Sequence, residues 1–79
     1  MDVKEKIFGY IKEHFEIGDD PDFTADVNMF DYGFVDSLGA IEIISFVENT
    51  WNIEITQQDL TLYSMNTVDE IAEVVSGKL

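Results

Sequence analysis

Three segments of the chain repeat apolar residues at helical spacing, and this periodicity constrains the fold more than any other feature. Over roughly residues 2–17, apolar side chains recur at every fourth position: Val3, Ile7, Ile11 and Phe15. A second apolar stripe runs from about Ser37 to Trp51, and a third from about Val68 to Lys78. Residues three and four apart share one face of a helix, so each segment has a face to bury. The pattern predicts an all-α fold.

Local signals mark where the expected helices begin and end. Asp36 is the expected N-cap of the second helix, because its carboxylate can accept hydrogen bonds from the free N–H groups of the first turn. Two sequences, Thr67-Val68-Asp69-Glu70 and Thr56-Gln57-Gln58-Asp59, are typical of capping boxes. The second of them predicts a short helical turn through residues 60–62. Gly18 is placed to end the first helix.

Two connecting segments complete the expected fold. Residues 53–56 alternate like a strand but have no partner, so we expect an extended connector. Residues 19–36 form a long connection by ordinary standards. That connection is rich in apolar residues, namely Phe23, Val27, Met29, Phe30, Tyr32, Phe34 and Val35. A loop this apolar must pack onto the helices. We therefore predict a small four-helix bundle, with three main helices, one short helix and a long first loop.

Size and charge exclude several classes of protein. The 79 residues suit a single domain spanning 1–79. Seventeen Asp and Glu against four Lys and Arg give a net charge of −13, the opposite of a nucleic-acid binder. The negative charge also disfavours binding to anionic membranes, and no apolar run is long enough to span a membrane. Without cysteine there is no disulfide or thiolate metal site, and we expect no metal. A cytoplasmic monomer is the expectation.

The second helix carries more apolar surface than one core face requires. Leu38 and Ile41 lie away from its main stripe, beside Glu42, Ser45 and Glu48. In one interpretation the long loop folds over Leu38 and Ile41. In the other they form an exposed apolar patch, rimmed by acids, where a partner docks. The carboxylates of Asp36, Glu42 and Glu48 would then steer a basic partner.

Ser37 stands at the start of that helix, directly after the expected cap. Its hydroxyl would face solvent, and the free N–H groups of the helix start favour an anion beside it. A phosphodiester on Ser37 would suit this position. A simple helix-start serine is the other interpretation.

The sequence around Ser37 resembles the acyl carrier protein family. Asp36-Ser37-Leu38 is similar to the Asp-Ser-Leu motif of that family, and Ile41-Glu42-Ile43-Ile44 is similar to its Val-Glu-Leu-Val run. Further matches stand where the family has core residues: Val47, Trp51 and Ile55. The resemblance is firm from Phe30 to Val75 and extends upstream by length and period.

The resemblance implies a free-standing, acyl-carrier-like protein rather than an enzyme. A phosphopantetheinyl transferase of the holo-carrier synthase type would attach 4′-phosphopantetheine, taken from coenzyme A, to Ser37 between Asp36 and Leu38. The thiol of the arm would hold an acyl or aminoacyl group as a thioester. The family's partner-facing residues correspond here to Leu38, Ile41, Glu42, Ser45 and Glu48. Acyl-loading ligases, synthases and transferases would meet them with basic patches.

Departures from the family pattern favour a specialised carrier. Gly39 replaces a typical Asp, Ser45 replaces a usually apolar residue, and Gly33 lies four residues before Ser37. These features resemble carriers of lipid- or polyketide-type pathways, and also D-alanyl carrier proteins, more than housekeeping fatty acid biosynthesis. Cargo, pathway and sequestration of an acyl chain by the bundle stay open.

Three other classes compete with a carrier. A serine hydrolase lacks the Gly-x-Ser-x-Gly elbow, and its only possible histidine base is His14. A calcium loop beginning at Asp20 would need a glycine where Ala25 stands and a glutamate where Asp31 stands. An acidic protein-interaction domain without a prosthetic group is the remaining alternative.

Overall fold

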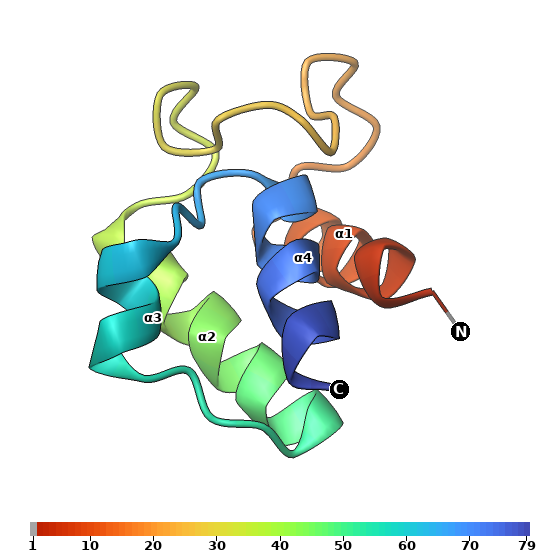
Figure 1. Ribbon diagram of the computed structural model, residues 1–79. Coiled ribbons are helices and arrows are strands. Elements are labelled where there is room, and N and C mark those ends of the chain that lie inside the picture. Colours follow the sequence, from red (N-terminus) through yellow and green to blue (C-terminus); the bar gives the residue numbers. More distant parts are fainter. Residues whose placement is uncertain (1) are drawn as a thin grey trace.

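Helices form where the apolar periodicity predicts them (Figure 1). The computed structural model describes residues 2–79 and contains, over that range, four helices and no strand. Their bounds are Val3–His14 for α1, Ser37–Trp51 for α2, Gln57–Leu62 for α3 and Val68–Lys78 for α4. Residues 53–56 are a connector, as expected. The predicted acyl-carrier-like fold, with three main helices and one short one, is therefore confirmed.

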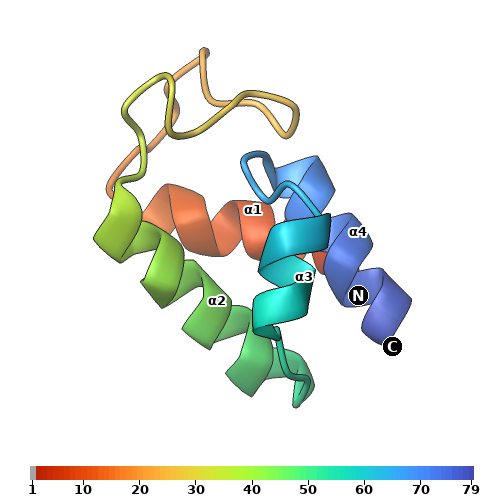
Figure 2. The ribbon, with the colours of Figure 1, turned by 60° about the vertical axis from the view of Figure 1, so that its left-hand side comes forward.

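The long first loop lies across one end of the bundle. Figures 1 and 2 show it passing above α1 and above the start of α4, and these two helices pack side by side. Two backbone hydrogen bonds tie the loop to the start of α4. The Met29 N–H donates to the Asn66 carbonyl at 2.9 Å, and the Asp69 N–H donates to the Ala25 carbonyl at 2.9 Å. The loop is thus ordered and packed, as its apolar content predicts.

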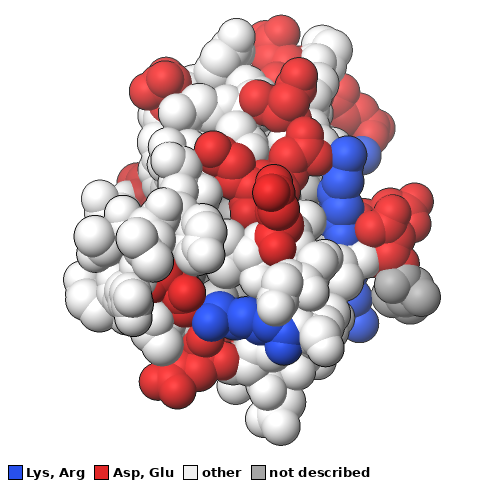
Figure 3. All heavy atoms as spheres, viewed as in Figure 1, with Lys and Arg blue, Asp and Glu red and all other residues white. Residues whose placement is uncertain are grey.

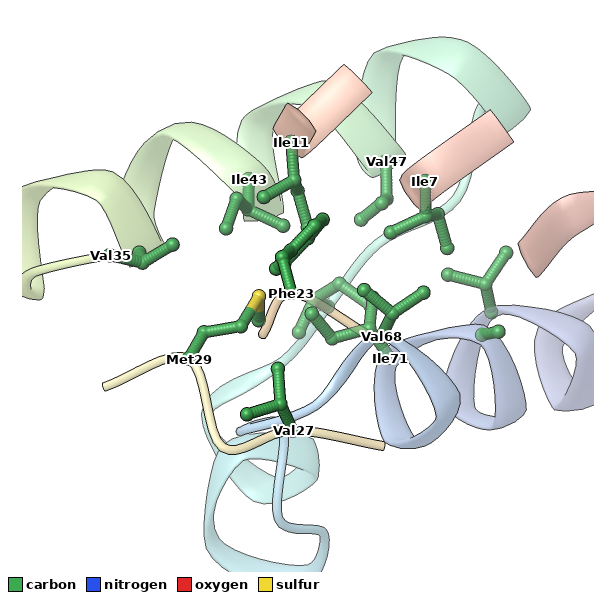
Figure 4. Close-up of a cluster of buried hydrophobic side chains, with 13 residues drawn as sticks. Ile7, Ile11, Phe23, Val27, Met29, Val35, Ile43, Val47, Val68 and Ile71 are labelled. Atoms are coloured by element: carbon green, nitrogen blue, oxygen red, sulfur yellow. The ribbon is translucent and has the colours of Figure 1, made fainter. Parts of the chain in front are cut away.

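The core is assembled from α1, the first loop, α2, the connector after it and α4 (Figure 4). Side chains from α1, the loop, α2 and α4 point toward one another and are almost fully buried, among them Ile7, Ile11, Phe23, Met29, Val47, Val68 and Ile71. Four residues of the first loop, Phe23, Val27, Met29 and Val35, lie in this core. The loop therefore covers the core, as a further helix would in a larger bundle.

Both expected capping boxes are present. The Thr56 hydroxyl accepts a hydrogen bond from the Asp59 N–H, and the Asp59 carboxylate accepts one from the Thr56 N–H. Thr67 and Glu70 make the same reciprocal pair at the start of α4. Each pair satisfies N–H groups that a helix start otherwise leaves open.

The first helix ends earlier than the sequence predicts. It stops at His14 instead of continuing to about residue 17, and Glu16 takes up the left-handed conformation with φ 54°. The Ile17 N–H then donates to the Lys12 carbonyl at 2.9 Å, which is the Schellman arrangement. Gly18 also has a positive φ but lies beyond this turn. Its expected role as the helix stop is wrong, because the chain turns early enough to pack Ile17 against the core.

Candidate functional site

Ser37 is the first residue of α2, and Asp36 caps the helix as expected. The Asp36 carboxylate accepts a hydrogen bond from the Gly39 N–H at 2.8 Å, while its carbonyl accepts one from the Ala40 N–H at 2.9 Å. Ser37 is exposed, and no hydrogen bond joins its hydroxyl to another residue within 2–79. The hydroxyl is thus accessible to a reagent or an enzyme.

The loop before Ser37 is held against the core. The N–H groups of Phe34 and Val35 both donate to the Met29 carbonyl, at 2.9 and 3.2 Å, and the Val35 side chain is only 4% exposed. Gly33 makes the turn that precedes them, with a φ of 76° that favours glycine. The start of α2 is therefore a firmly anchored point, although Ser37 itself projects to solvent.

Gly39 allows α1 and α2 to approach closely next to Ser37. A Cβ atom at position 39 would lie 2.7 Å from Cε1 of Phe15 and 2.8 Å from Cγ1 of Val35. Phe15 caps the end of α1, and Val35 belongs to the anchored loop. The glycine is thus a packing requirement between three segments of the chain.

The face of α2 beyond the core stripe is exposed. Leu38 is 72% and Ile41 64% exposed, so the long loop does not cover them and the interpretation in which it does is wrong. Ser45 lies on the same face and is also exposed. Exposed aliphatic side chains next to Ser37 form the kind of apolar patch that marks an interaction surface.

Of the three acids predicted beside this patch, Asp36 caps α2, and the other two have different surroundings. Glu42 is exposed and its carboxylate lies 3.1 Å from Nε2 of His14, at the end of α1. Glu48 is half-buried, and its carboxylate accepts a hydrogen bond from the Ile55 N–H at 2.9 Å. Glu42 is therefore exposed to a partner while its carboxylate contacts His14, whereas Glu48 holds the connector after α2.

The sequence did not indicate that aromatic residues pack beside Glu42. The Tyr10 ring stacks on Phe46 with centroids 3.8 Å apart, and His14 stacks on Tyr10 at 4.9 Å. Burial, and secondarily the negative charge of Glu42, raise the pKa of the Tyr10 hydroxyl. The only signal in the sequence is that Tyr10 and His14 are four residues apart on one helix face, which does not name their partners on α2.

Neither the hydrolase nor the calcium alternative gains support from the geometry. His14 contacts Glu42, which is five positions along α2 from Ser37, and makes no hydrogen bond to the Ser37 hydroxyl. In the loop, the Asp20 carboxylate accepts a hydrogen bond from the Asp22 N–H, and Asp26 accepts one from the Thr24 hydroxyl. These acids thus stabilise local turns. Over residues 2–79 no cluster of three or more potential metal ligands occurs.

On one face of the molecule, little charge lies on the side of α3. On the face drawn in Figure 3, acidic side chains gather near α4, whereas the side on which Figure 1 places α3 is largely uncharged. Residues 60–66 contain no charged side chain.

Within residues 2–79, no helix has both the length and the apolar character that a membrane crossing requires.

Comparison with known proteins decides the family. A family model described as "Phosphopantetheine attachment site" matches residues 5–75. The chain belongs to this family of phosphopantetheine-binding carriers. The carrier is similar to the D-alanyl carrier protein of Streptococcus suis (strain 05ZYH33), with 35% identity over 71 residues, which is 90% of this chain and 87% of the relative. It is also similar to the D-alanyl carrier protein of Streptococcus sanguinis (strain SK36), with 32% identity over 76 residues, or 96% and 94% of the two chains.

Membership of the family implies a covalent 4′-phosphopantetheine group on the carrier. When bound, this group supplies a terminal thiol that can hold a carboxylic acid as a thioester. The start of α2 fits such an attachment, because it combines an accessible hydroxyl with the positive end of a helix. A carrier of this family interacts with a phosphopantetheinyl transferase and with ligases or transferases in general.

Proposed function

We propose that this protein is a free-standing, non-catalytic carrier of the D-alanyl type, in which 4′-phosphopantetheine on Ser37 holds an aminoacyl group. The observation that carries this proposal is the similarity to D-alanyl carrier proteins along nearly the whole chain. Gly33 and Gly39 around Ser37 are in keeping with it. Both residues depart from the pattern of housekeeping fatty acid carriers, and together with Ser37 they resemble the pattern of D-alanyl carrier proteins.

Ser37 is the proposed attachment residue because its surroundings suit a phosphodiester. Its hydroxyl is exposed, and the first turn of α2 contains no acidic residue after the Asp36 cap. In a chain with a net charge of −13, this lack of acidic residues in the first turn matters, because carboxylates there would repel a phosphate. Leu38, on the next position, would border the arm on its apolar side.

The exposed face of α2 is the proposed docking surface. Leu38 and Ile41 would make the apolar contact, Ser45 would lie between them and the far end of the helix, and Glu42 would attract basic partners. Glu48 would contribute charge while holding the Ile55 N–H. The partners we propose are a phosphopantetheinyl transferase of the holo-carrier synthase type and an aminoacyl-loading ligase. The setting is the cytoplasm, with the carrier a monomer because its charge opposes self-association.

A second candidate is a carrier of acyl chains for a specialised lipid- or polyketide-type pathway or for fatty acid biosynthesis. One observation favours it. A cleft of about 410 Å³ lies between α2 and α3, and its walls include apolar side chains of α2: Ala40, Ile43 and Ile44. A buried acyl chain would require such an apolar space.

Two measurements test the attachment and the cargo in turn. Incubation with coenzyme A and a broad-specificity transferase should add one phosphopantetheine to the intact mass. Ser37→Ala should abolish the gain without changing the melting temperature, because the hydroxyl makes no internal hydrogen bond. An unchanged mass of the folded wild type would contradict the carrier proposal and favour an interaction domain.

The loaded form then identifies the cargo. The holo protein is offered to adenylating ligases with D-alanine, L-alanine or a medium-chain fatty acid, and thioesters are detected by mass. Loading with D-alanine alone supports the proposal. Loading with the fatty acid but not with D-alanine would replace it by the second candidate.

A further inference from the structure

A groove of about 630 Å³ lies between α3 and α4. One wall comes from the end of α3 and the residues after it, and the other comes from α4. The side chains that matter below are Leu62 and Tyr63 on the first wall, and Glu70, Glu73, Val74 and Gly77 on the second. None of the lining residues belongs to α2, so the groove is separate from the docking surface proposed above.

The wall from α4 is a second face of that helix. Its residues stand at positions i, i+3, i+4 and i+7, the spacing that places side chains on one helix face: Glu70, Glu73, Val74 and Gly77. The core face of α4 is a different and buried stripe, made of Val68, Ile71, Ala72 and Val75. The second stripe covers two turns, about 10 Å of helix axis. A stripe of this spacing and length is what another helix packs against.

The wall from α3 is apolar and exposed. Leu62 is 63% and Tyr63 52% exposed, and residues 60–66 contain no charged side chain. Val74 lines the groove from the α4 side and is half-buried. Exposed apolar side chains that gather in this way mark an interaction site. The groove therefore offers apolar contact along one of its edges.

The opposite edge is acidic. Glu73 is exposed, and its carboxylate makes no ion pair or hydrogen bond within residues 2–79. Glu70 uses only Oε1 to cap the start of α4. The third acid of the groove, Asp59, is neutralised by the Lys78 ammonium at 2.7 Å. The uncompensated charge is thus negative and lies on α4, beside the uncharged side of α3 (Figure 3).

Two features keep the groove open. Asp59 belongs to the capping box of α3, so its ion pair with Lys78 ties the two walls together at the end of α4. Gly77 contributes no side chain, and an added Cβ would meet nothing within 4 Å. Glycine inside a helix costs about 1 kcal/mol relative to alanine, and no packing among residues 2–79 requires it here. A bare backbone at this point lets another chain approach closely.

We propose that the groove between α3 and α4 binds an amphipathic, basic helix of a partner protein, with its apolar edge on Leu62 and Tyr63 and its basic residues toward Glu73. The occupant is a helix because the stripe on α4 has helical spacing over two turns. It is basic because the acids of α4 are uncompensated. A second copy of this chain, with a net charge of −13, would be repelled. The inference goes beyond the proposed function and does not depend on the attachment of an arm.

The test is a nuclear magnetic resonance titration of the full ¹⁵N-labelled chain. The probe is a peptide of about 15 Leu and Lys residues, long enough to form a helix with one apolar face. The amide signals of Tyr63, Glu73 and Gly77 should shift about twofold or more beyond those of Leu38 and Ile41 on α2. A peptide of the same composition, scrambled so that it has no apolar face, should lose this preference. Larger shifts on α2, or an equal response to both peptides, would overturn the proposal.

A matched pair of variants locates the peptide. Gly77→Leu fills the groove, and Gly9→Leu makes the same change on α1, where an added Cβ also meets nothing within 4 Å. Both variants should melt at or above the wild-type temperature, because leucine is the better helix former. Gly77→Leu should weaken peptide binding about tenfold or more, since central contacts carry most of the energy of an interface. Binding that is unaltered in Gly77→Leu, or lost equally in Gly9→Leu, would refute the site.

A second pair separates the groove from general attraction to an acidic protein. Glu73→Gln and Glu54→Gln each remove one exposed acid, and only Glu73 lines the groove. Glu73→Gln should weaken binding more than Glu54→Gln, and equal losses would overturn the proposal. A dilution series without peptide covers the other occupant, because groove signals that move with protein concentration would identify a second copy and likewise overturn it. The mass test on Ser37 uses neither peptide nor groove, so either proposal can fail while the other stands.

Discussion

Replacement of Gly39 by alanine should destabilise the protein, although alanine is the better helix former. Gly39 is buried in the first turn of α2, and an added Cβ would lie 2.7 Å from Cε1 of Phe15 and 2.8 Å from Cγ1 of Val35. Side-chain carbons do not tolerate such distances. One of the two neighbours, or the start of α2 itself, must therefore move.

Two opposing effects set the size of the loss. Alanine gains about 1 kcal/mol over glycine inside a helix. Overpacking of a filled core costs about 1–3 kcal/mol. Val35 is only 4% exposed and has a branched, stiff side chain, so the cost belongs in the upper part of that range. The expected net loss is about 1–2 kcal/mol, or roughly 4–16 °C in melting temperature for a domain of this size.

Thermal and urea unfolding, followed by circular dichroism at one pH and salt concentration, measure this effect. Gly9 provides the matched control, because it lies exposed in α1 and an added Cβ would meet nothing within 4 Å. Gly9→Ala should therefore raise the melting temperature, by a free energy of up to about 1 kcal/mol. If Gly39→Ala raised it in the same way, the close-packing argument would be refuted.

The charged groups supply three more predictions. Glu48→Ala should lower the free energy of unfolding, measured in urea, by about 1–2 kcal/mol, because the Ile55 N–H loses its acceptor. Glu42→Ala should change it by less than about 0.5 kcal/mol. Equal effects of the two substitutions would contradict the different roles of Glu42 and Glu48. The Lys78 ammonium, and then the Thr56 N–H, lower the pKa of Asp59 from 3.8 to about 2. The stability that the Asp59–Lys78 ion pair contributes is present above pH 4 and lost toward pH 2. The difference in melting temperature between wild type and Lys78→Met should therefore narrow over that range. A constant difference would argue against the ion pair. Raising sodium chloride from about 20 to about 300 mM should raise the melting temperature by screening a net charge of −13, and a flat response would mean that the charges are already compensated.

Capping explains why three of the four helices could be predicted closely. Asp36, Thr56 and Thr67 each accept a hydrogen bond from an N–H three residues ahead. Such contacts lie within one helical turn, so the residues that make them are adjacent in the sequence. The order of the first loop was predictable for a related reason, because seven apolar side chains cannot all remain in water.

The end of α1 was not predictable in the same way. Its stop depends on Glu16, a residue with no preference for the left-handed conformation, which adopts it so that Ile17 can pack on the core. The stabilising contact is the packing of Ile17 on the core, which forms away from residue 16. The local sequence therefore does not predict the left-handed conformation of Glu16.

The sequence by itself determined the helices, the apolar loop and the motif around Ser37, because these depend on local caps and on periodicity. Only the tertiary structure decided what surrounds that motif. It left Leu38 and Ile41 exposed, required glycine at position 39, and brought His14 to Glu42 across 28 residues of sequence. The physical reason is that each of these features depends on which segments pack against α2, and periodicity states which face of a helix is buried without stating against what.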